Sequence, residues 1–78
     1  MSALDIDFII SDLAKQGHFE RLEALLLSCH NNASGLLDWA GHGAAEGGHI
    51  KKAEEFIQRG ADVSFVLRGA ALSGYVSF

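Results

Sequence analysis

Apolar residues recur along this chain at the spacing of amphipathic helices. Two stretches share one pattern, with apolar residues at i, i+3, i+6 and i+7: Phe19, Leu22, Leu25 and Leu26, then Ile50, Ala53, Phe56 and Ile57. This spacing puts the apolar side chains on one helix face, and no stretch sustains the period of two that a half-buried strand shows. With glycines that interrupt the helical pattern, it predicts an all-α fold with helices over 4–16, 19–28, 35–46, 50–59 and 64–73.

The chain also repeats itself. Three segments align, beginning at Leu13, Ala44 and Ala70, with offsets of 31 residues (13 to 44) and 26 residues (44 to 70). The five extra residues of the longer offset indicate a loop at Cys29–Gly35, which lies between two helices and is rich in polar residues. We therefore interpret residues 1–78 as a single domain of two helix–turn–helix units and an incomplete third, over about 4–33, 34–62 and 63–78.

Two columns of the alignment carry structural expectations. One consists of glycines, predicted to form the turn inside each unit: Gly17, Gly48 and Gly74. The other consists of aromatic residues, which we expect to be buried at equivalent places between units: Phe8, Trp39 and Phe65.

Each unit has an inner helix rich in small residues and an amphipathic outer helix. Gly43 and Gly69, at matching places of two inner helices, should let adjacent inner helices approach closely. Charges four residues apart, Lys51 with Glu55 and Glu55 with Arg59, indicate the solvated face of one outer helix.

The second unit contains a familiar series of residues. The segment GAAEGGHIKKAEEFIQRGADV at 43–63 resembles an ankyrin repeat, which typically reads A-A-x-x-G-H-x-x-x-V-x-x-L-L-x-x-G-A-D-V. Similar but shorter series occur in the first unit (LAKQGHF, 13–19) and in the third (GAALSGYV, 69–76). The family's T-P-L-H opening is replaced by WAGH at 39–42 and FVLR at 65–68. The resemblance implies an ankyrin-like helix–turn–helix solenoid of about two and a half repeats. Its β-turn fingers would be reduced or absent, as in the short, divergent arrays of some bacterial effector proteins.

Composition and charge narrow the possible partners and compartments. Six Lys+Arg against ten Asp+Glu give a formal charge of −4, which argues against nucleic acid as the main partner. No apolar run reaches the roughly 18 residues of a membrane span, and the first residues lack the basic start of a signal peptide. A single cysteine forms no internal disulfide, so we expect an intracellular protein. The expected compartment is the cytoplasm, or a host cytoplasm if the chain is a bacterial effector.

The histidines, the cysteine and the glycines do not form a recognisable chemical motif. Cys29, His30, His42 and His49 lack the spacing of a zinc site, and His18 and His49 are better explained by the repeated Gly-His turn. Cys29 and His30 are adjacent and so would not face each other on a helix, and the glycines over 41–48 lack the Lys-Ser/Thr ending of a phosphate loop. We therefore expect no metal, no cofactor and no catalysis.

One predicted surface remains as a candidate site. Residues four apart on each inner helix, polar except for one leucine, share a face, and the repeat brings the three sets side by side. We name this surface the inner-helix patch; its residues are Asp7, Ser11, Lys15, Asp38, His42, Glu46, Ser64, Arg68 and Leu72. It is either an ordinary solvated face or the ligand-facing side of the solenoid.

These observations favour a protein–protein interaction module that binds a protein partner through the inner-helix patch. Two alternatives remain open. The chain is a repeat segment of a larger enzyme or effector with its active site elsewhere, or it is a self-assembling domain. In the second case, an apolar end containing Tyr75, Val76 and Phe78 would form a homodimer.

Overall fold

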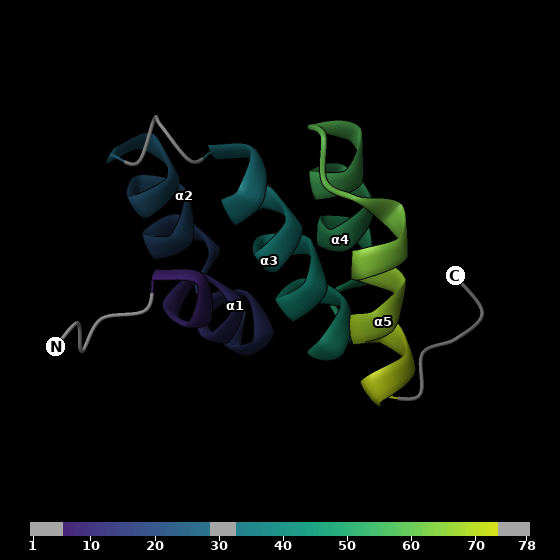
Figure 1. Cartoon of the computed structure of the whole chain (residues 1–78). Coiled ribbons are helices and arrows are strands. Elements are labelled where there is room, and N and C mark those ends of the chain that lie inside the picture. Colours follow the sequence, from purple (N-terminus) through teal and green to yellow (C-terminus); the bar gives the residue numbers. More distant parts are fainter. Residues whose placement is uncertain (1–5, 29–32, 74–78) are drawn as a thin grey trace, which may run out of the picture.

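The computed structural model describes residues 6–28 and 33–73, and within them the chain forms five α-helices and no strand. The helices are α1 (Ile6–Gln16), α2 (Phe19–Ser28), α3 (Ala33–Glu46), α4 (Ile50–Gln58) and α5 (Val63–Ser73) (Figure 1). The all-α prediction is confirmed, with helix ends within two residues of those expected. The loop predicted over residues 29–35 is partly wrong, because α3 begins at Ala33; residues 29–32 lie outside the described residues.

Two helix pairs are joined by the same tight turn. Gly17 and Gly48 have φ angles of 86° and 84°, a left-handed conformation that only glycine adopts without strain. In each turn the glycine N–H donates to the carbonyl three residues back, and the following histidine N–H to the carbonyl five residues back, at 2.8–3.1 Å. This is the Schellman arrangement that closes a helix C-terminus. The predicted turn column is therefore confirmed at two places, and Gly74 lies outside the described residues.

The helices form two layers. The inner helices α1, α3 and α5 lie side by side, and the outer helices α2 and α4 pack behind them (Figure 1). A Cβ atom on Gly43 would stand 2.9 Å from the Cα and the carbonyl carbon of Ser11, and one on Gly69 would stand 3.0 Å from the carbonyl carbon of His42. Neighbouring inner helices thus touch backbone to backbone at repeat-equivalent positions, as the small residues predicted.

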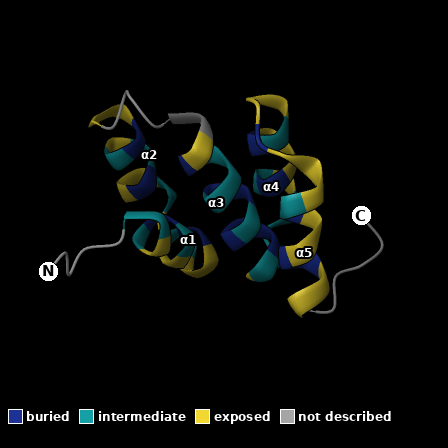
Figure 2. Ribbon diagram, in the orientation of Figure 1, coloured by how far each residue is buried: buried dark blue, intermediate teal, exposed yellow. Residues whose placement is uncertain are grey.

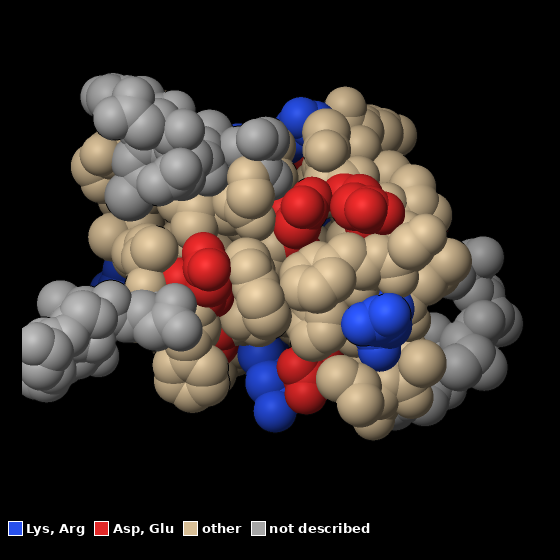
Figure 3. Space-filling view, viewed as in Figure 1, with Lys and Arg blue, Asp and Glu red and all other residues tan. Residues whose placement is uncertain are grey.

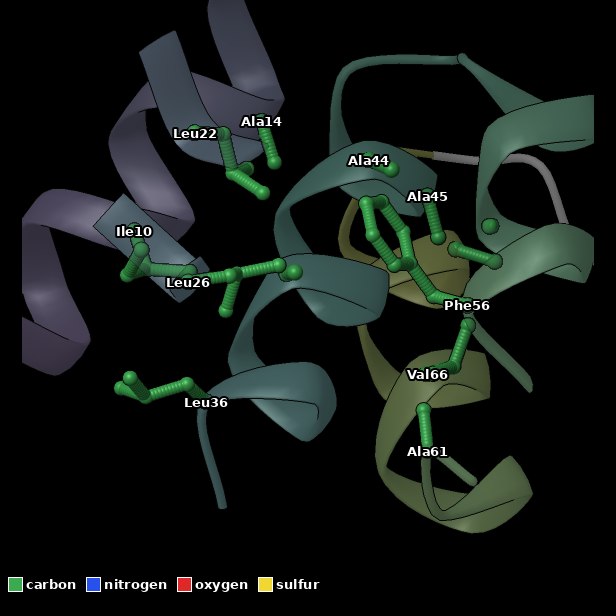
Figure 4. Close-up of a cluster of buried hydrophobic side chains, with 13 residues drawn as sticks. Ile10, Ala14, Leu22, Leu26, Leu36, Ala44, Ala45, Phe56, Ala61 and Val66 are labelled. Atoms are coloured by element: carbon green, nitrogen blue, oxygen red, sulfur yellow. The ribbon is translucent and has the colours of Figure 1, made fainter. Parts of the chain in front are cut away.

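The core lies between the two layers and includes residues of all five helices. Its largest fully buried side chains are Phe56, Ile10, Leu22, Leu36 and Val66. Figure 4 shows α1 and α2 residues clustered on one side of α3, and Phe56, Ala61 and Val66 clustered on the other. Figure 2 shows the same buried stripe, with exposed residues on the outer faces of the helices.

The predicted aromatic column is wrong at its first position. Phe8 is 68% exposed, whereas Trp39 and Phe65 are half-buried and their rings meet edge to face, with centroids 4.8 Å apart. His42 packs its ring against both of them. On α1 the residue equivalent to His42 is Ser11, which has no ring to complete such a cluster, so Phe8 remains in solvent.

Candidate functional site

The inner-helix patch lies on α1, α3 and α5, as predicted. On the face seen in Figure 3, acidic and basic groups both occur among uncharged surface, and at its lower edge a basic group lies directly against an acidic one. Lys15, Ser64, Arg68 and Leu72 are exposed, while the other members are half-buried. The patch therefore combines exposed groups with groups that are partly buried against neighbouring helices.

An ion pair crosses the seam between α1 and α3. The Lys15 Nζ lies 3.5 Å from Glu46 Oε2, and the other carboxylate oxygen of Glu46 lies 4.0 Å from His42 Nδ1. The Lys15 side chain is about half exposed, so solvent weakens this pair and it contributes little to stability. The contact orients the Glu46 carboxylate between a lysine of α1 and a histidine of its own helix.

His42 occupies the centre of the patch and is nearly enclosed. Its side chain is 12% exposed, and its ring centroid lies 4.9 Å from that of Phe65. Its buried Nδ1 has no hydrogen-bond partner among the described residues. Burial lowers the pKa of His42 below its usual 6.5, an effect that Glu46 opposes and Arg68 reinforces. The neutral imidazole is therefore favoured, and the ring acts mainly as an aromatic packing element.

Asp38 binds the beginning of α5. Its Oδ1 accepts a hydrogen bond from the Asp62 N–H at 2.7 Å, and Asp62 Oδ1 in turn accepts one from the Ser64 N–H at 2.9 Å. Carboxylates satisfy the unpaired N–H groups at a helix N-terminus and are favoured there by the helix dipole. Asp38 thus has a structural role in joining α3 to α5.

The histidine of the second turn also has a structural role. His49 Nε2 lies 3.3 Å from the Lys15 carbonyl oxygen, near the end of α1, and its ring meets Phe19 edge to face at 5.3 Å. Since a carbonyl only accepts, this contact assigns the proton to Nε2. His49 therefore contacts the end of α1 and the beginning of α2, and so links the second helix pair to the first.

The remaining chemical candidates do not converge. No group of three or more His, Cys, Asp or Glu able to hold a metal ion occurs in the described part of the chain. Cys29 and His30 lie outside it. Residues 41–46 of the glycine-rich stretch are helical, and Gly41 and Gly43 are buried packing positions. Among the described residues no helix is long and apolar enough to cross a membrane.

Sequence reasoning missed one contact between the outer helices. Arg59, just beyond α4, donates two hydrogen bonds to the Glu23 carboxylate of α2, at 2.7 and 3.1 Å. The pairs predicted within α4 are not the ones formed, because Glu55 pairs with Lys52 at 3.5 Å instead. The Glu23 and Arg59 side chains border a small groove of about 120 Å³ over the seam between the two units.

Comparison with protein-family models, with curated proteins and with solved structures finds no match to this chain. Any functional assignment therefore depends on the residues and their geometry.

Proposed function

We propose that this chain is a protein–protein interaction module, an ankyrin-like helical array that binds a protein partner through the inner-helix patch and has no catalysis of its own. One observation carries the proposal. Gly43 and Gly69 bring three inner helices into backbone contact, so side chains from all three contribute to a single surface. Stacked repeats commonly use such extended faces to bind partners.

The chemistry of the patch supports a protein as the partner. On α5, the exposed guanidinium of Arg68 lies one turn from Leu72, which is 69% exposed. Arginine is enriched at protein interfaces and among the few residues that carry most of the binding free energy. An exposed leucine beside it adds apolar area that a partner can bury. On α1, Lys15 adds a second exposed cation. We therefore assign the direct contacts to Lys15, Arg68 and Leu72, and positioning roles to Asp38, His42 and Glu46.

The proposal is tested by site-specific photo-crosslinking in cells, with a photoreactive residue replacing either Leu72 or, as a control, Lys51 on α4. Both positions are exposed, so neither replacement disturbs the core. We expect one protein partner to crosslink at Leu72 and not at Lys51. The partner identified in this way is then titrated against Arg68→Glu and Lys51→Glu, each expected to change stability by no more than about 0.5 kcal/mol. The Arg68→Glu change should weaken binding and Lys51→Glu should not. Crosslinks confined to the outer helix, or equal affinities of the two variants, would contradict the proposal.

A further inference from the structure

Helix α5 leaves a stripe of apolar side chains uncovered. Val63 is 49% exposed, Leu67 is 39% exposed, and Ala71, one turn further along, is also exposed. Residues four apart share a helix face, so these three form one stripe. It lies beside the inner-helix patch and is distinct from it.

The positions equivalent to Leu67 and Ala71 are buried in the first two units, and those equivalent to Val63 are partly buried. Leu67 aligns with Gly41 and Ile10, both of which are buried. A Cβ on Gly41 would lie 2.6 Å from Cγ2 of Val66 on α5 and 3.5 Å from the Cβ of Phe56 on α4. On α3, the next inner helix and the outer helix α4 therefore cover this place together.

The same holds on α1 for the residues equivalent to Leu67 and Ala71. Ile10 and Ala14 point into one cluster with Leu22 and Leu26 of the outer helix α2 (Figure 4). The stripe on α5 therefore has the features of a surface built for an outer helix, and no outer helix covers it within the described residues.

A charge on α4 leads to the same conclusion. Glu23 of α2 is bound by Arg59, which follows the next outer helix. The residue of α4 aligned with Glu23 is Glu54 (23 plus the offset of 31), and it is exposed with no ion pair to a described residue. Glu23 binds Arg59 where α4 packs beside α2. Glu54 is the equivalent carboxylate on α4, at the place where a further outer helix would pack beside α4.

We propose that the α5 stripe and Glu54 bind an amphipathic helix from a protein partner, in the position that α2 takes over α1 and α4 over α3. The surface extends the row in which α2 and α4 pack side by side. A ligand that continues this row is a helix like α2 and α4. The helix carries apolar residues at i, i+3, i+6 and i+7, as α2 and α4 do, and a basic residue at its C-terminal end to meet Glu54.

The chain supplies its own probe for this surface. Leu67 is large, like Ile10 and unlike Gly41, so the sequence of α2 fits the stripe better than that of α4. The probe is a fluorescent peptide of residues 18–28 with Ser28→Arg, because position 28 aligns with Arg59. A lactam between Glu20 and a lysine placed by Ala24→Lys stabilises the helix, which is too short to form well alone. Both lactam positions are exposed in α2.

Binding of the probe to the 78-residue chain is measured by fluorescence anisotropy, with circular dichroism to verify each variant's fold. We expect saturable binding that Leu67→Glu weakens at least tenfold. The matched control Phe8→Glu, at an exposed apolar residue of α1, should leave binding unchanged. Glu54→Arg should weaken binding about threefold, as expected for an exposed ion pair, and a probe with Ser28→Glu should restore it.

Several results would overturn the proposal. One is the absence of saturation at millimolar peptide, and another is equal binding by wild type and Leu67→Glu. Self-association of the chain in a sedimentation series, abolished by Leu67→Glu, would show that a second copy covers the stripe. Nuclear Overhauser contacts from residues 74–78 to Leu67 would show that the chain's own residues do.

Discussion

Replacing Gly43 by alanine tests the close packing that joins the inner helices. A Cβ at this position would lie 2.9 Å from two backbone atoms of Ser11, and closer still to its carbonyl oxygen. Backbone in the middle of a helix cannot rotate away as a flexible side chain can, so α1 and α3 must separate. Relieving this overlap also disturbs the core beneath the seam.

The expected change in the stability of Gly43→Ala is the sum of two opposing effects. Overpacking costs about 1–3 kcal/mol, and the backbone contact places Gly43→Ala at the upper end of that range. Replacing glycine by alanine inside a helix stabilises the folded state by about 1 kcal/mol, because alanine has the higher helix propensity. The expected net loss of about 2 kcal/mol corresponds to a fall of about 8–16 °C in Tm for a domain of this size.

Gly35 supplies the matched control in the same helix. It is exposed, and a Cβ there would meet nothing within 4 Å, so Gly35→Ala should stabilise the chain by about 0.5–1 kcal/mol. Thermal and urea unfolding, followed by circular dichroism and by the fluorescence of Trp39, measures both variants. If Gly43→Ala were as stable as the wild type, the inner helices would not touch as described. The residues of the inner-helix patch would then not form one continuous surface.

Two further predictions concern the core and the buried histidine. Phe56→Ala should cost about 3–5 kcal/mol and leave little folded protein, whereas Phe8→Ala should stay within about 0.5 kcal/mol of wild type; equal melting of the two variants would refute the described burial. Because burial lowers the pKa of His42 in the folded state, the unfolded state binds more protons below the usual pKa of 6.5. Stability should therefore be fully present above that pH and decline as the pH falls below it, more in the wild type than in His42→Gln; a His42 pKa at or above 6.5 in an NMR titration would contradict this.

Local chemistry was sufficient to predict the helices and the turns between them. Apolar spacing indicates where each amphipathic helix runs, and a glycine with positive φ, as at Gly17 and Gly48, closes a helix through bonds to residues three and five positions back. The close approach at Gly43 and Gly69 was also predictable, because a repeat places equivalent residues at equivalent seams. These features depend on neighbours in sequence or on the repeat itself.

The environment of each polar or aromatic side chain was decided by the tertiary structure. Arg59 follows Glu55 by four residues along the chain, yet it binds Glu23, since packing of α4 beside α2 brings that carboxylate into bidentate reach. Phe8 shares a column with Trp39 but is exposed, because Ser11 has no ring to complete a cluster like that of Trp39, His42 and Phe65. Alignment identifies equivalent positions along one chain, whereas burial and pairing depend on what the neighbouring helix places opposite them, and only the packed structure determines that.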